Sequence, residues 1–219
     1  MTMRILSSRD DLERALNEVG EALAEEVKAY LIGGCAMILY NAKVATKDID
    51  LVLLSANDAE SVVSALSKTG FKVAVPRDHV YFRLGTAVMM EDNRGMRIDI
   101  FVETVCRKVK LTSGMAARSK LHSRYGKLDI NLVSPEDIFL FKSVTEREGD
   151  LDDMARLAER GLDWHTILEE CAVQSGDVIL EGYLAVRLQE LEEQKGIVSP
   201  IKAELEEITE KKLGARRQN

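Results

Sequence analysis

The sequence has little of what marks several common kinds of functional site. Of its 219 residues, only three are cysteines and three are histidines. Cys35, Cys106 and Cys171 are far apart and show no paired spacing typical of zinc, so we expect buried thiols in a reducing cytoplasm. The histidines are equally scattered, which argues against a histidine-based metal site.

Long apolar runs and an excess of positive charge are also missing. No apolar run approaches the roughly 20 residues that span a bilayer, and the early charges near the N-terminus predict no signal peptide. We therefore expect a cytoplasmic protein that does not enter the membrane. The formal net charge of −7 argues against general coating of nucleic acid, although it leaves room for a local basic groove.

The composition favours a folded chain with two parts. Hydrophobic residues make up 46% and charged residues 31% of the sequence, which is enough to bury a sizeable core. Strand and helix patterns are mixed up to Val133, and only helical patterns follow it. We predict an α/β domain over residues 1–133 and an all-helical domain over residues 134–219.

The expected elements are read from hydrophobic periodicity and turn residues. Helices are predicted over residues 8–28 and 57–69, and strands near 30–32, 48–54, 71–75, 79–84, 86–90, 96–102 and 128–133. Further helices are predicted near 135–147, 151–160, 164–173, 178–195 and 200–213. The apolar stripe of the helix at 178–195 indicates either a bundle helix or a surface for a dimer or partner.

The stretch from Tyr30 to Leu51 carries the most informative pattern. A short apolar strand is followed by Gly33-Gly34, a short helix, and a second strand that contains Asp48 and Asp50. Residues i and i+2 of a strand point to the same face, so the two aspartates project together. Paired carboxylates repel each other unless a cation lies between them, and Mg²⁺ is the simplest cation for an all-oxygen site. The glycines open a helix, where free N–H groups suit a phosphate.

This order of residues resembles the signature of the nucleotidyltransferase superfamily that includes DNA polymerase β. In that signature, a glycine followed by Gly or Ser precedes Asp-hydrophobic-Asp after a spacer of about this length; Gly33, Gly34, Asp48 and Asp50 match it. The resemblance implies a mixed-sheet core, two magnesium ions, and transfer of a nucleoside monophosphate from an NTP to a hydroxyl acceptor.

The loop before the second strand matches the family only in part. The family commonly shows basic-x-(Ser/Thr)-x-Asp-x-Asp, and Thr46 fits this pattern with Lys43 close by. Val44 stands where an arginine is frequent. The resemblance assigns Lys43 and Thr46, with the two glycines, to nucleotide binding.

A third acid lies in the strand predicted at 96–102. Asp99 lies between Ile98 and Ile100 and therefore points to the face opposite both. On a strand beside Asp48 and Asp50 it completes a three-carboxylate cluster, as the third acid of the family does; all three are then catalytic and metal-binding. The alternative is an aspartate on a solvated face, paired with Arg97.

A second resemblance lies at the start of the helical part. Lys142, Arg147, Asp150 and Asp153 are similar to the Lys…Arg…Asp-x-x-Asp segment of the abortive-infection type nucleotidyltransferase toxins. That resemblance implies that the lysine touches the triphosphate and that the acids lie at the active site, so all four are candidate nucleotide-binding residues. The alternative is a surface lysine and ordinary first-turn acids.

The segment from Arg107 to Lys127 is basic and contains no acidic residue. One interpretation is a positive rim for a triphosphate or an RNA backbone, with His122 and Tyr125 stacking on bases. The other is a solvated helix and turn that balances acidic neighbours. The sequence leaves both open.

The sequence therefore predicts a Mg²⁺-dependent nucleotidyltransferase. Its acceptor is open: the 3′ end of a tRNA, a hydroxyl on a protein, or a small molecule. A toxin-like enzyme restrained by an antitoxin is one form of this hypothesis, and a homodimer through the C-terminal helices is another possible assembly. The alternative is a non-catalytic nucleotide-binding or protein-interaction module with the same fold.

Overall fold

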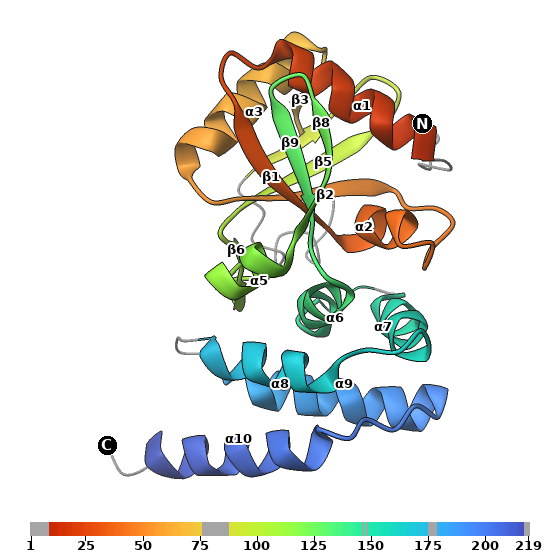
Figure 1. Cartoon of the computed structure of the whole chain (residues 1–219), viewed down its shortest axis with the longest axis vertical. Helices are drawn as coiled ribbons and strands as arrows, with labels where there is room; N and C mark the ends of the chain where they lie inside the picture. The colour runs from red at the N-terminus through yellow and green to blue at the C-terminus, as the bar shows by residue number, and fades with distance from the viewer. Residues whose placement is uncertain (1–8, 76–87, 146, 148, 175–178, 217–219) are drawn as a thin grey trace. The chain divides into compact units, whose positions relative to one another are not determined.

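The computed structural model describes residues 9–75, 88–145, 147, 149–174 and 179–216 (Figure 1). Contacts divide the chain into two compact units, residues 1–134 and 135–219. The first unit is α/β and the second is helical, which confirms the predicted class. The strand expected at 79–84 lies outside the described residues.

Within the described residues, seven strands of the first unit form one mixed sheet in the order β3-β4-β5-β2-β1-β9-β8. Strand β1 is antiparallel to β2 and parallel to β9, and β2 is parallel to β5. The remaining neighbours are antiparallel. The strands are β1 (Val27–Ile32), β2 (Asp48–Leu53), β3 (Lys72–Val73), β4 (Val88–Glu91), β5 (Arg97–Val102), β8 (Lys120–Tyr125) and β9 (Leu128–Leu132).

Helices α1 and α3 pack against each other and against the sheet, whereas α2 packs against β1 and β2 (Figure 1). Helix α3 begins where the Ser55 hydroxyl accepts a hydrogen bond from the backbone N–H of Asp58, a standard N-cap. A short hairpin and a short helix connect β5 to β8. These elements are α1 (Arg9–Ala22), α2 (Gly33–Leu39), α3 (Ala56–Lys68), β6 (Thr104–Val105), β7 (Val109–Lys110) and α5 (Ser113–Arg118).

The first helix is shorter than the sequence predicts. It ends at Ala22 instead of Lys28, and β1 already begins at Val27. Val27 pairs with Leu128 of β9, and its side chain is buried in the core. Pairing with a neighbouring strand therefore overrides the helical pattern of this stretch, because local propensity is weaker than burial in a sheet.

The second unit consists of helices packed around one apolar core. Phe139 and Trp164 meet edge to face with their ring centroids 5.4 Å apart. The apolar stripe of α9 is buried inside this unit, so its interpretation as a bundle helix is confirmed. The helices are α6 (Pro135–Ser143), α7 (Asp150–Glu159), α8 (Trp164–Val173), α9 (Leu180–Lys195) and α10 (Lys202–Arg216).

Helix α6 also ends before the predicted residue, at Ser143 instead of Arg147. The hydroxyl of Ser143 donates to the carbonyl of Leu140, and that of Thr145 donates to the carbonyl of Lys142. Such local side-chain bonds compete with the helical ladder and suit a helix end.

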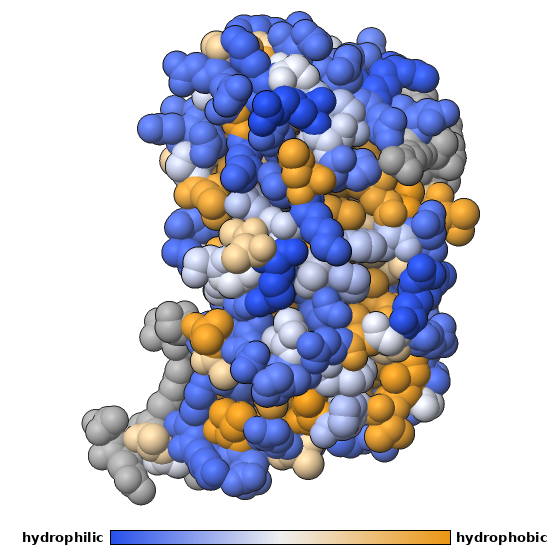
Figure 2. Space-filling view, in the orientation of Figure 1, coloured by the Kyte–Doolittle hydropathy of each residue, from blue (hydrophilic) through white to orange (hydrophobic). Residues whose placement is uncertain are grey.

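Figure 2 shows a mainly hydrophilic face with hydrophobic residues in separate groups. Among the described residues, no helix is long and apolar enough to span a bilayer. The three cysteines are buried, as predicted.

Candidate functional site

The central strand β2 carries two of the predicted acids. Asp48 and Asp50 alternate with Ile49 and Leu51, whose side chains are buried. Because β2 lies between β1 and β5 in the middle of the sheet, the aspartates are themselves almost fully buried. The sequence dictates this arrangement, since the apolar residues take one face of the strand and the acids take the other.

Strand β5 brings the third acid beside them. In the parallel pairing of β2 with β5, Asp50 lies opposite Asp99 and Asp48 lies opposite Arg97. Asp99 is 0% exposed, so the alternative of a solvated aspartate is wrong. We refer to Asp48, Asp50 and Asp99 as the acid cluster.

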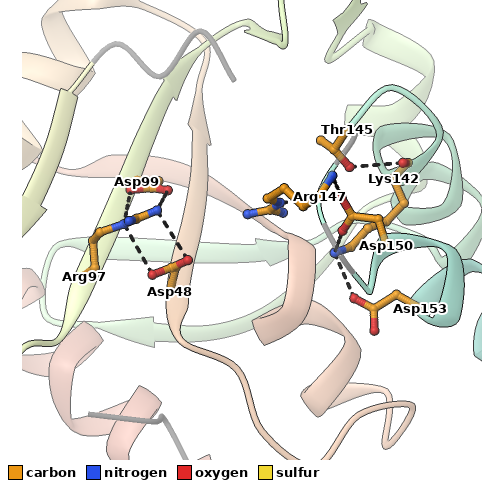
Figure 3. Close-up of polar contacts among 8 residues, drawn as sticks. All are labelled: Asp48, Arg97, Asp99, Lys142, Thr145, Arg147, Asp150 and Asp153. Atoms are coloured by element: carbon orange, nitrogen blue, oxygen red, sulfur yellow. Dashed lines mark hydrogen bonds and ion pairs between the residues drawn. The ribbon is translucent and has the colours of Figure 1, made fainter. Parts of the chain in front are cut away.

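Arg97 holds two members of the acid cluster (Figure 3). Its Nε and Nη2 donate to the two carboxylate oxygens of Asp99 at 2.9 and 2.8 Å. The same two nitrogens lie 3.3 and 3.4 Å from the carboxylate oxygens of Asp48. Arg97 is only 8% exposed, so this is a buried ion pair. The alternation of β5 pointed to an Arg97–Asp99 pair but not to its burial or to its contact with Asp48.

The acid cluster carries more negative charge than Arg97 can balance. Burial, together with the charges of Asp50 and Asp48, raises the pKa of Asp99 to about 7, although Arg97 opposes the shift. The guanidinium of Arg97 thus pairs with Asp48 and Asp99, while the carboxylate of Asp50 lies beside Asp99 in the ladder. Binding of a cation would stabilise such a cluster, because the cation reduces the repulsion between the carboxylates.

The glycine pair lies directly against the acid cluster and the preceding loop. Gly33 begins α2 with φ +65°, and a Cβ at this position would come within 2.1 Å of the Asp50 carboxylate. A Cβ on Gly34 would lie 2.3 Å from the Thr46 hydroxyl. Only glycine permits this approach of backbone to side chain. The structure therefore brings together Gly33, Gly34, Thr46 and Asp50, as the sequence motif predicts.

Cys35 and Lys43 also lie near the acid cluster. The Cys35 thiol is buried and donates to the carbonyl of Asp48 at 3.3 Å. Burial, Asp50 and Asp48 raise its pKa well above the ordinary value, while the charge of Lys43 opposes them. Cys35 is therefore a neutral thiol and not a nucleophile. Lys43 lies near enough for its charge to act here, whereas Val44 is exposed to solvent.

Whether a metal fits can be judged from the side chains. Among the described residues, no group of three or more His, Cys, Asp or Glu side chains could hold a metal ion as it stands. Arg97 lies against the carboxylate oxygens of Asp48 and Asp99. The donor set nevertheless has the chemistry of a magnesium site, because Mg²⁺ needs only one or two protein carboxylates and the acid cluster has an excess of negative charge.

The second motif forms a separate buried network in the helical unit (Figure 3). Nζ of Lys142 lies 2.7 Å from Asp150 and 2.9 Å from Asp153. Asp150 also accepts from the backbone N–H of Arg147 at 3.2 Å. Lys142 is 4% exposed, so the alternative of a surface lysine is wrong. We refer to these four residues as the lysine cluster; their contact with a nucleotide stays a prediction.

The charge balance of the lysine cluster differs from that of the acid cluster. Arg147 and Arg156 add ion pairs of 3.6 Å to Asp150 and Asp153. Burial alone would raise the pKa of Asp150, but Lys142 and Arg147 outweigh it, and the pKa lies below its ordinary value. Both carboxylates are thus matched by cations.

The basic segment contains a helix and turns, as one interpretation expects, and also a strand. Most of it lies in α5 and in β8, the strand at one end of the sheet order. Arg124 pairs with Asp129 through bonds of 2.5 and 2.8 Å at the surface. The Tyr125 side chain is buried, so stacking of a base on Tyr125 is not supported. Whether the exposed basic residues bind RNA stays open.

Comparisons with known proteins add no assignment. No family model matches the chain, and no curated protein is significantly similar to it. The resemblance to nucleotidyltransferases accordingly rests on the motif residues and on the strand pairing that brings them together.

Proposed function

We propose that the chain is a nucleotidyltransferase that moves a nucleoside monophosphate from an NTP to a hydroxyl acceptor. One observation carries the proposal: Asp50 lies in register with Asp99 and also directly against Gly33, with Asp48 on the same face of the sheet. Three carboxylates and a glycine backbone at one place suit a phosphate-bearing substrate, because the carboxylates attract cations and the glycines leave room for phosphate oxygens.

In this proposal each residue has a defined task. Asp48 and Asp50 would hold magnesium ions, and Asp99 would bind the ion on the acceptor side and take up the proton of the acceptor hydroxyl. The acceptor oxygen forms a bond to the α-phosphorus, the bond from that phosphorus to the bridging oxygen breaks, and pyrophosphate leaves. Bound magnesium would neutralise charge on the attacking and leaving oxygens.

The remaining candidate residues would position the nucleotide. Gly33 and Gly34 let the backbone approach the phosphates, and Thr46 and Lys43 line the same part of the α/β unit. The lysine cluster is a further proposed contact for the triphosphate. Asp150 and Asp153 already pair with Lys142, so the ammonium group of Lys142 would have to interact with these carboxylates and with the phosphates at the same time.

A second candidate is a nucleotide-binding or protein-interaction module without catalysis. Arg97 favours it, because an acid cluster that is already ion-paired can persist in a fold without a metal. Partners are proposals under either function: an RNA or protein acceptor, an antitoxin-like protein, or a second copy of the chain. Toxicity on expression that disappears in Asp50→Asn would support the toxin-like form.

The test is incubation with each α-labelled NTP, Mg²⁺, total RNA and cell protein. We expect wild type, but not Asp50→Asn, to label an RNA or protein band, which would identify acceptor and base together. Asp129→Asn is the matched control, since it removes a carboxylate from the same sheet at the surface pair with Arg124. Nucleotide binding without label in any band would favour the non-catalytic module.

A further inference from the structure

Arg97 occupies the position that a metal ion would need in the acid cluster. Its Nε and Nη2 face all four carboxylate oxygens of Asp48 and Asp99, at distances from 2.8 to 3.4 Å. Figure 3 shows the guanidinium lying between the two acids. A cation that bound those oxygens would have to replace at least part of these contacts.

The strand pairing keeps Arg97 in this position. Arg97 is two residues before Asp99, so both side chains leave β5 on the same face, and it is directly opposite Asp48 in the ladder. The backbone of a central strand cannot withdraw without breaking the sheet. Only the side chain of Arg97 can move, and its long chain allows a rotamer change.

We propose that Arg97 is a resident counter-ion of the acid cluster, which divalent cations displace, so that Arg97 lowers the metal affinity of the site. The proposal rests on the metal-binding part of the proposed function. It adds a residue that controls the loading of the site: Arg97 donates to Asp48 and Asp99, so its release would make these two carboxylates available to a cation.

Arg97 has two effects of opposite sign. It stabilises the metal-free protein, because it compensates buried carboxylates that would otherwise repel one another. It weakens metal binding, because charge-assisted hydrogen bonds must break before the cation reaches the oxygens. A residue that merely supported the fold would show the first effect without the second.

The test is a titration with Mn²⁺ followed by electron paramagnetic resonance. Arg97→Met should bind Mn²⁺ about tenfold more tightly than wild type, or more, since the guanidinium no longer competes, and should melt at a lower temperature without metal. Arg124→Met is the matched control: it removes a guanidinium paired with Asp129 at the surface and should leave the Mn²⁺ affinity unchanged. Equal or weaker binding by Arg97→Met would overturn the inference.

A measurement on wild type keeps the inference testable if Arg97→Met does not fold. The Nε–H resonance of Arg97 should shift as Mg²⁺ saturates the site, whereas that of Arg124 should not. An unmoved Arg97 resonance in protein that has bound Mg²⁺ would refute the displacement and leave the proposed function standing. Absence of Mn²⁺ and Mg²⁺ binding in wild type, with or without a non-hydrolysable NTP, would refute both.

Discussion

The two buried charge clusters differ in their balance. In the acid cluster, Arg97 pairs with two of the three carboxylates, and the pKa of Asp99 is raised to about 7 by burial and by Asp50. In the lysine cluster, Asp150 and Asp153 are matched by Lys142 and two arginines, and the pKa of Asp150 is lowered. Both clusters are buried, so burial alone does not distinguish them.

The contrast separates a cluster with an excess of negative charge from a cluster whose charges are matched. A buried carboxylate with matched cations contributes to a defined packing, whereas an excess of like charge costs free energy until a cation arrives. Strongly perturbed carboxylates of the second kind occur preferentially at functional sites. The acid cluster is therefore the better candidate for chemistry, and removing a charge should affect the two clusters in opposite ways.

The largest expected effect is on transfer activity. Asp50→Asn should reduce it by about 10³-fold or more, because the metal contributes several kcal/mol of charge stabilisation. The free energy of unfolding should stay the same or rise, since one source of repulsion is gone. Labelled-NTP transfer and urea unfolding measure the two quantities. Activity within tenfold of wild type would show that Asp50 holds no essential metal.

The opposite result is expected in the lysine cluster. Lys142→Met leaves Asp150 and Asp153 buried without their central cation, and breaking a buried pair costs about 3–5 kcal/mol of stability. Urea unfolding of the helical unit measures the loss. Lys211→Met is the control, because it removes a lysine from an exposed pair with Glu207 and should change little. Similar results for both variants would contradict a structural role for Lys142.

The stability losses caused by alanine at two glycines, one beside each cluster, test how closely the backbone packs against the acids. Gly33→Ala combines strain at φ +65° with overlap against Asp50, together about 2–4 kcal/mol, and should weaken Mn²⁺ binding. Gly149→Ala, at φ +89° with open space around it, should cost only the strain, about 1–2 kcal/mol. Equal losses, measured by urea unfolding, would show that the contact with Asp50 is unimportant.

The sequence predicted the site residues that follow from strand alternation. Asp48, Asp50 and Asp99 were identified because an acid between apolar residues of a strand has a defined face. The sequence could not show that Arg97 is buried and contacts Asp48, because this contact depends on the register of β5 with β2. For the same reason it left Lys142 open as a surface residue: only the packing of α6 against α7 reveals that both acids meet it.

The fold shows the same division between local and long-range information. The class and most elements follow from periodicity, and the helix at Trp164–Val173 has the predicted bounds. The start of β1 at Val27 was missed, because it is fixed by pairing with β9, about 100 residues later in the chain. Local patterns predict elements well where no distant strand competes for the same residues.

The response of the metal-free protein to pH compares the two clusters by the sign of their pKa shifts. Asp150 has a lowered pKa in the folded state, so its stabilising contribution is present above its ordinary value of 3.8 and is lost as the pH falls through the folded pKa. Asp99 has a raised pKa, so the folded state binds its proton more tightly than the unfolded state does. Stability therefore falls as the pH rises from 3.8 to about 7.

The free energy of unfolding in urea, measured with a chelator from acid to neutral pH, compares the opposite pH dependences that Asp99 and Asp150 give to stability. The stability of Asp99→Asn relative to wild type should increase with rising pH, because asparagine cannot acquire the unfavourable charge. The stability of Asp150→Asn relative to wild type should decrease over the acid range as the pH rises, because wild type gains the ion pair with Lys142 there. If both differences change in the same direction, the two clusters do not differ in charge balance, and this argument for the acid cluster as the better candidate for chemistry fails.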